Sequence, residues 1–308
     1  MKCPWIIPVL FAVTACSTPP VPAATNTTVP TREPTATMTR TPTRTPVVET
    51  STSTAVPRLP PEQWQEWPAI PEVISQRVVE IYENGLAMGN NPHAYSKIGG
   101  CLDTPGWFLG PYDGNPDLYS LGEYSYLQEV ITTFQGSHDR TSIAAGIGYS
   151  SANVLTTFMA DPKQCESKET PLACEVRLHQ PSFAFVSLGS NDIYHQDKFA
   201  DNMRQILDYL IEHGVVPILI SKADNLEGDH AVNLEIARLA YEYDLPYWNF
   251  WLVVQPLPNH GLQEDGAHLT WAGPYFDDPL RMKAAWPWRN LTALQTLEAV
   301  WRGVTFVP

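Results

Sequence analysis

The chain has 308 residues, a formal net charge of −14 at pH 7 and 44% hydrophobic residues. This length is enough for one large α/β domain with appendages or for two small domains. The negative charge argues against a nucleic-acid partner, because the protein would repel the phosphates. Basic residues outnumber acidic ones in residues 1–60, so the rest of the chain is more acidic than the whole.

The N-terminus has the pattern of a secretory signal. Lys2 precedes an apolar stretch, residues 5–13, that is too short to cross a bilayer, and small residues then lead to Cys16. With a cysteine directly after Ala15, the segment resembles the lipobox of bacterial lipoproteins. That resemblance implies cleavage before Cys16, lipid attachment at Cys16, and an extracytoplasmic protein anchored to the bacterial cell membrane. A single-pass membrane anchor is the alternative.

Residues 16–60 form a low-complexity segment in which Thr, Pro and Ser occupy more than half of the positions. Such a segment buries too little apolar surface to offset the entropy lost on ordering, so we predict an extended, solvated tether. A flexible chain of this length spans roughly 35–40 Å. The predicted organisation is a signal over residues 1–15, a tether over 16–60 and a folded domain over 61–308.

Cysteine usage fits an oxidising compartment. Cys165 and Cys174 flank a polar loop, and we predict a disulfide between them that stabilises the fold by roughly 2–3 kcal/mol. Cys101 is then left as a free thiol in an extracytoplasmic protein, which calls for a functional reason.

Hydrophobic periodicity predicts an alternation of helices and strands in the body of the chain. This alternation favours a parallel sheet covered by helices on both faces, which is a three-layer α/β/α sandwich of the flavodoxin-like kind. The predicted helices span residues 71–88, 121–134, 152–159, 201–213, 229–243 and 290–302, and the predicted strands span residues 93–98, 142–145, 183–186, 215–221 and 245–250.

The predicted central strand, residues 183–186, is followed at once by Gly189, Ser190, Asn191 and Asp192. Ligands of open α/β sheets bind at the carboxyl ends of the strands, so this position favours a chemical role for the Asn-Asp pair. A capped turn is the alternative, since both residue types favour turns for reasons of their own backbone.

A second candidate cluster lies late in the chain, where Asp265 precedes His268 by three residues. At this spacing the carboxylate can accept a hydrogen bond from one imidazole nitrogen, which leaves the other nitrogen free to act as a base. A surface turn is the simpler interpretation. A metal site through His260, Asp265 and His268 is a third, although the segment lacks a compact ligand motif.

Taken in order, four short segments resemble the sequence blocks of SGNH hydrolases, also called GDSL esterases and lipases. Residues 97–101 (KIGGC) stand where that family has a Gly-Asp-Ser block ending in the nucleophile. Gly148 matches a glycine whose N–H helps form the oxyanion hole. Residues 189–192 (GSND) match the block whose asparagine is a further oxyanion donor, and residues 265–268 (DGAH) match the block that supplies the acid and base.

The resemblance implies that His268, oriented by Asp265, activates Cys101 for attack on an ester carbonyl. The N–H groups of Cys101 and Gly148 and the Asn191 amide would form the oxyanion hole, with Gly189 and Asp192 as supporting residues of that block. No metal or organic cofactor is implied. The sequence departs from the family pattern at two positions, with Cys101 in place of serine and Gly100 in place of aspartate.

Two classes of function follow. The first is a surface-tethered ester hydrolase with a Cys-His-Asp triad, acting on small esters or on acyl groups of glycans; a thiol-dependent acyltransferase is a variant of it. The second is a non-catalytic module of the same fold that binds carbohydrate or another extracellular ligand, with Cys101 buried and inert. Trp107, Trp271 and Tyr275 would stack on sugars in either case, or serve only in packing.

Overall fold

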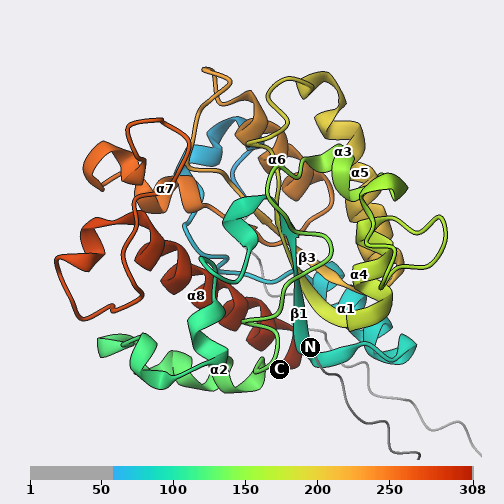
Figure 1. The fold of residues 1–308 in the computed structure, drawn as a ribbon, viewed down its shortest axis with the longest axis horizontal. Helices are drawn as coiled ribbons and strands as arrows, with labels where there is room; N and C mark the ends of the chain where they lie inside the picture. The colour runs from blue at the N-terminus through green and yellow to red at the C-terminus, as the bar shows by residue number, and fades with distance from the viewer. Residues whose placement is uncertain (1–57, 307–308) are drawn as a thin grey trace, which may run out of the picture. The chain divides into compact units, whose positions relative to one another are not determined.

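The computed structural model describes residues 58–306. Its centre is a parallel sheet of four strands in the order β1-β2-β3-β4. Figure 1 shows α3, α4 and α5 on one side of the strands and α7 and α8 on the other. The strands are β1 (Asn91–Gly99), β2 (Pro181–Ser187), β3 (Val216–Ile220) and β4 (Tyr247–Trp248), and the α-helices are α1 (Gln76–Met88), α2 (Gln128–Thr133), α3 (Ser151–Val154), α4 (Pro171–His179), α5 (Gln196–Glu212), α6 (Ala231–Glu242), α7 (Phe250–Val254) and α8 (Ala285–Thr305).

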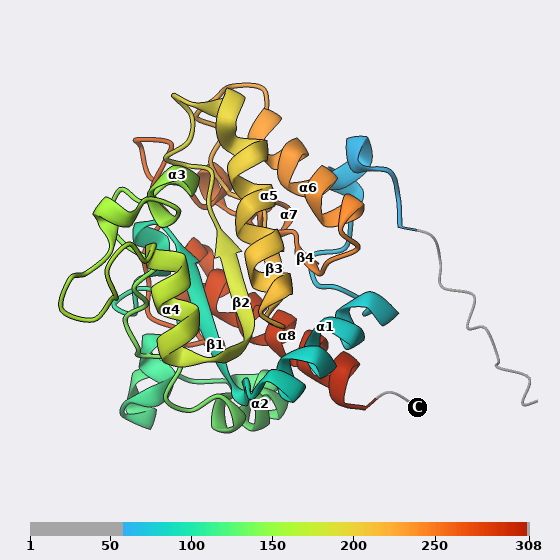
Figure 2. The same cartoon turned by 90° about the vertical axis from the view of Figure 1, so that its right-hand side faces the viewer.

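Both faces of the sheet are covered, which confirms the predicted three-layer α/β/α arrangement. Helices α4 and α5 contact β1 and β3 from one side, and Figure 2 shows them in front of the strands with α8 behind. On the opposite side, Tyr82 of α1 stacks on Phe183 of β2. The β2 side chains from Phe183 to Val186 are all buried, which explains why this strand is apolar without alternation.

Residues 142–145, predicted as a strand, do not form one. The side chain of Ser142 accepts a hydrogen bond from the backbone N–H of Ala144, and its carbonyl accepts from the N–H of Ala145. This local turn competes with ladder pairing, so only an isolated parallel bridge between Ala145 and Gly99 remains. The last strand is also shorter than predicted, because Asn249 caps α7 through its side chain.

Several helix boundaries differ from the predicted ones, and capping residues decide those of α1. Helix α1 begins after Ser75, whose hydroxyl accepts from the N–H of Val78, and it ends at Gly89 in the left-handed conformation. The closing helix α8 begins at Ala285, five residues earlier than predicted. The segments predicted as helices over 121–134 and 152–159 are each divided between a short α-helix and a 3-10 turn.

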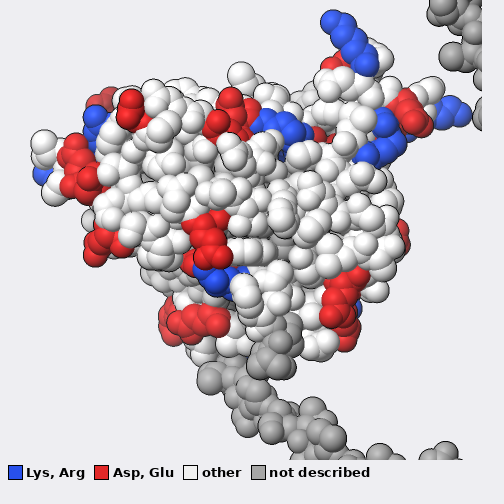
Figure 3. All heavy atoms as spheres, turned by 90° about the horizontal axis from the view of Figure 1, so that it is seen from below, with Lys and Arg blue, Asp and Glu red and all other residues white. Residues whose placement is uncertain are grey.

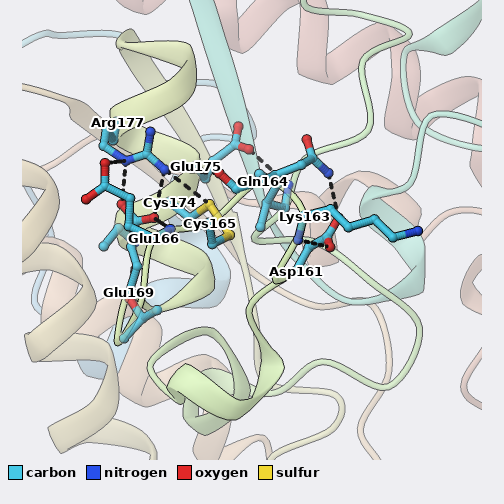
Figure 4. The surroundings of a disulfide bond; sticks show 12 residues. Asp161, Lys163, Gln164, Cys165, Glu166, Glu169, Cys174, Glu175 and Arg177 are labelled. Carbon is cyan, nitrogen blue, oxygen red and sulfur yellow. Dashed lines mark hydrogen bonds and ion pairs between the residues drawn. A yellow bond between two sulfur atoms is a disulfide. The ribbon is translucent and has the colours of Figure 1, made fainter.

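The predicted disulfide between Cys165 and Cys174 is present (Figure 4). It links a loop to α4, whose first turn is capped by Thr170 through a hydrogen bond from the N–H of Ala173. Arg177, one turn further along α4, donates to the Glu169 carboxylate at 2.7 Å and 2.8 Å. Cys101 is a free cysteine, as predicted.

In the view of Figure 3, the surface of residues 58–306 carries no extended basic region. Small groups of carboxylates are interspersed there with single basic side chains. This distribution agrees with the acidic composition of the body. Within residues 58–306, no helix is both long and apolar enough to cross a bilayer. The predicted signal, the lipid attachment site at Cys16 and most of the tether lie outside the described residues.

Candidate active site

A cavity of about 120 Å³ opens at the carboxyl ends of β1, β2 and β3. Residues that follow all three strands line it, and the loop that contains His268 reaches it from a distant part of the chain. It thus lies where parallel α/β sheets commonly bind ligands. Its polar and charged lining residues are Cys101, Asp103, Tyr149, Ser187, Ser190, Asn191, Lys222, His268 and Arg289.

Cys101 begins a 3-10 turn, residues Cys101–Asp103, directly after the end of β1. Burial raises the pKa of its thiol, and the negative charge of Asp103 raises it further; the N–H groups of Cys101 and Leu102 and the charge of Arg289 lower it. Among residues 58–306, no hydrogen bond joins the thiol to His268. The thiol therefore lies in surroundings that raise its pKa above the ordinary value.

Asp265 and His268 form the pair that their spacing predicts. The Nδ1 atom of His268 lies 2.6 Å from Oδ2 of Asp265, and Oδ1 accepts from the N–H groups of Ala267 and His268. These two N–H groups, followed by the imidazole, lower the pKa of Asp265 to about 2. Because Nδ1 is hydrogen-bonded to Asp265, Nε2 is the ring nitrogen that is free to accept a proton from a group in the cavity. The pair is open to solvent, with side-chain exposures of 59% for His268 and 49% for Asp265.

The loop after β2 presents Asn191 to the cavity and is anchored by its neighbour. Asp192 is buried and accepts from both the backbone N–H and the hydroxyl of Ser151, at 3.0 Å and 2.6 Å to Oδ1. Gly189 adopts a φ of +129°, and a Cβ there would lie 2.6 Å from the Val232 side chain. Glycine is therefore required at position 189, and the block over 189–192 has a defined shape.

The amide of Asn191 donates through Nδ2 to the carbonyl of Tyr149 at 2.8 Å. The same nitrogen lies 3.2 Å from the position that a Cβ on Gly100 would occupy. The amide thus stands beside the residue that precedes Cys101. A side chain at position 100 would force it to move, so glycine at this position leaves room for Asn191 next to the thiol.

Gly148 has a φ of +78° and lies next to Tyr149, which lines the cavity, whereas Gly148 itself does not. The N–H groups of Gly148 and Cys101 have no backbone acceptor within residues 58–306. Both are therefore available as donors, although Gly148 is not among the residues that line the cavity.

Sequence reasoning missed a set of buried charges around the cavity. Asp103 pairs with Arg289 of α8 at 2.9 Å, and each residue is 1% exposed. Lys222, after β3, pairs with Asp224 at 2.7 Å and with Glu227, and the Ser190 hydroxyl donates to Asp224. Only the rarity of charged residues in otherwise apolar surroundings could have pointed to them.

The aromatic residues proposed to stack on sugars do not line the cavity. Trp107 is half exposed and stacks on Trp286 at a centroid distance of 5.9 Å. The hydroxyl of Tyr275 donates to the carbonyl of Asp117, and its ring packs on the guanidinium of Arg281, which is a packing role. Trp271 is 66% exposed.

The alternative metal set does not come together. Among the described residues, the only convergent group of ligand-type side chains contains Cys165, Glu169 and Cys174, and the two cysteines are joined in the disulfide. The imidazole of His260 lies instead 3.1 Å from the carbonyl of Gln255.

No protein-family model matches the chain, and no curated protein matches it. Among solved structures, it is similar to a GDSL-like lipase from Bacteroides thetaiotaomicron, at 14% identity and a TM-score of 0.39 over 72% of this chain and 97% of that one. It is also similar to the esterase EstA from Pseudoalteromonas sp., at 14% identity and a TM-score of 0.40 over 67% and 97% of the two chains. A third is an acetyl xylan esterase from Geobacillus stearothermophilus, at 11% identity and a TM-score of 0.41 over 69% and 96%.

Proposed function

We propose that the protein is an ester hydrolase of the SGNH type that uses Cys101 as its nucleophile, with His268 as base and Asp265 as the acid that orients it. The observation that carries the proposal is the cavity itself. A free thiol, an Asp-oriented imidazole and an asparagine amide line it, and they come from segments far apart in the sequence. Nucleophile, base, orienting acid and amide donor are the groups that acyl transfer requires.

In the proposed reaction, Nε2 of His268 takes the thiol proton as the sulfur attacks the ester carbonyl. The C–O bond then breaks, the alcohol leaves with the proton from His268, and the acyl group stays on Cys101 as a thioester. A water molecule, deprotonated by His268, attacks this thioester and releases the carboxylic acid, and the proton returns to the sulfur.

The raised pKa of the Cys101 thiol favours activation by a base. A thiol that is neutral at rest needs a base at the moment of attack, in contrast to a pre-ionised thiolate–imidazolium pair. The oxyanion would be held by the N–H groups of Cys101 and Gly148 and by the Asn191 amide, and each such donor lowers the barrier by roughly 3–4 kcal/mol. Asn191 would keep one amide hydrogen on Tyr149 and turn the other toward the oxyanion.

The size of the cavity favours a small acyl group. A volume of about 120 Å³ is close to that of an engineered cavity that holds one benzene molecule. Short-chain esters, including acyl groups carried on extracellular glycans, are therefore the proposed substrate class. We further propose that the enzyme is tethered by lipid at Cys16 to the outside of the bacterial cell membrane, on the strength of the N-terminal pattern.

Turnover of p-nitrophenyl acetate by the purified chain tests the proposal, beside Cys101→Ala, Cys101→Ser and His268→Ala, with intact-mass spectra of each. We expect turnover in the unaltered protein, an acyl adduct on Cys101, and loss of turnover in both alanine variants. Turnover only in Cys101→Ser would mean an intact site whose cysteine does not act as nucleophile.

A non-catalytic binding module is the second candidate, and two observations favour it. The thiol makes no hydrogen bond to His268 within the described residues, and the Asn191 amide is already engaged by Tyr149. Catalytic hydrogen bonds are often loose in a ligand-free site, so the first observation does not decide the matter. Absence of both turnover and adduct in every variant would select this candidate.

A further inference from the structure

One guanidinium connects the two loops on which the proposed chemistry depends. Nη2 of Arg289 donates to Oδ1 of Asp103 and to the hydroxyl of Ser187, each at 2.9 Å. Asp103 closes the turn that begins with Cys101, and Ser187 is the last residue of β2, just before the loop that carries Asn191. Arg289 on α8 therefore joins the carboxyl ends of two neighbouring strands beneath the cavity.

The carboxylate of Asp103 is folded tightly under the end of β1. A Cβ on Gly99 would lie 2.1 Å from its Oδ2, so this backbone approach is possible only with glycine at position 99. Oδ2 of Asp103 and Nε of Arg289 have no hydrogen-bond partner within the described residues, although both side chains are almost wholly buried.

Three aromatic rings surround the guanidinium. Its central carbon lies 4.8 Å from the ring centre of Phe108, 5.2 Å from that of Phe250 and 5.5 Å from that of Trp248. Cation–π attraction favours this arrangement, yet two ions removed from water and incompletely hydrogen-bonded are weak contributors to stability. The pair is therefore better explained by what it positions than by the stability it adds.

The charges of the pair bear on Cys101 in opposite directions. Asp103 raises the pKa of the thiol, and Arg289 lowers it. Burial raises the pKa of Asp103 itself to about 6, against the lowering effect of Arg289. The other charged or titratable groups that line the cavity are Tyr149, Lys222 and His268.

We propose that Asp103 and Arg289 are positioning residues: together they hold the turn of Cys101 and the loop of Asn191 in register, and their charges act in opposite directions on the negative charge that the sulfur acquires. The effect on ester turnover rests on the function proposed above, whereas the effect on thiol ionisation does not. Neither residue touches the ester carbonyl in this role.

The rate at which iodoacetamide alkylates Cys101, measured from about pH 5 to about pH 10 on the full chain, reports thiol ionisation without requiring hydrolysis. Asp103→Asn removes the negative neighbour, so alkylation at pH 7 should accelerate about threefold or more. Arg289→Met removes the positive neighbour, so alkylation at pH 7 should slow by a similar factor. A role in packing alone would not move the two variants in opposite directions.

Glu175→Gln is the matched control. Glu175 is equally buried, is paired with Arg140 and bonds to Ser96 on β1, but it does not line the cavity. We expect its alkylation profile to match that of the unaltered protein. Near-UV circular dichroism identifies any variant that does not fold, and Arg289→Gln, which also removes the positive charge, then takes the place of Arg289→Met.

Arg289→Lys separates position from charge, because it keeps the positive charge but loses the fixed fork that reaches two acceptors. Its alkylation profile should stay unchanged while its turnover of p-nitrophenyl acetate falls about tenfold or more. Shifts of the same sign in Asp103→Asn and Arg289→Met, or shifts no larger than in Glu175→Gln, would overturn the proposal. If the unaltered protein proves inactive, the proposed function fails, and the alkylation arms still decide the role of the pair.

Discussion

Two aspartates stand next to the proposed reacting groups, and their surroundings are opposite. Asp265 lies on an exposed loop, and nearby N–H groups lower its pKa to about 2. Asp103 is buried under β1, and the loss of hydration raises its pKa to about 6 despite the adjacent Arg289. The contrast shows that hydrogen bonds from neighbouring residues control one carboxylate, whereas burial by the rest of the fold controls the other.

The largest expected effect concerns Asp265. Asp265→Asn should lower kcat/KM for p-nitrophenyl acetate about 10³-fold, because the imidazole loses its orienting acceptor and its preferred tautomer. The free energy of unfolding in urea should change little, since the carboxylate is open to solvent. Activity within tenfold of the unaltered protein would show that the pair is only a surface turn.

The protonation of Asp103 should make the free energy of unfolding depend on pH. Its native pKa is raised above the ordinary value, so the native state binds the proton more tightly than the unfolded state between about pH 4 and pH 6. The free energy of unfolding should therefore fall as the pH rises through this window, by roughly 3 kcal/mol from this group. Urea titrations of the unaltered protein and of Asp103→Asn at several pH values measure this fall. The difference in the free energy of unfolding between the two proteins should decrease as the pH rises through the window. A difference that stays constant would contradict the assignment.

Asn191 lies beside Gly100 and lines the same cavity as His268. Asn191→Ala should lower kcat about 10²-fold and leave KM nearly unchanged, because the amide acts on the oxyanion and not on the bound ester. Steady-state kinetics check this, with Asn153→Ala as a control that removes an amide from the Ser150 capping box outside the cavity lining. An equal loss in both variants would point to a role in folding of the loop.

The smallest expected effect is that of Gly100→Ala. The added methyl would lie 3.2 Å from Nδ2 of Asn191, closer than an ordinary contact, so the amide should move by a few tenths of an ångström. We expect kcat to fall about three- to tenfold with little change in stability, since the backbone at position 100 is extended and suits any residue. An increase in kcat would mean that the amide is better placed in the displaced position.

Local patterns in the sequence predicted much of what the structure contains. The alternation of helices and strands predicted a parallel sheet between two helical layers, and the spacing of Cys165 and Cys174 predicted their disulfide. The spacing of Asp265 and His268 predicted their hydrogen bond. Each depends on periodicity or on residues close together in the chain, so each can be recognised without the fold.

Contacts between distant segments could not be predicted in this way. The strand expected at 142–145 is lost to a turn formed by Ser142, because local side-chain hydrogen bonds there outweigh ladder pairing. The pKa of the Cys101 thiol likewise depends on burial and on the nearby charges of Asp103 and Arg289, which only the folded chain brings together.

The sequence by itself therefore determined the α/β layers, the disulfide and the acid–base pair, all of which follow from short-range spacing. Only the tertiary structure decided which groups surround the thiol: the amide of Asn191 beside Gly100, and Arg289 of the last helix beneath Asp103. The physical reason is that the energy of a charge depends on every group that excludes water from it, and those groups come together only when the chain is folded.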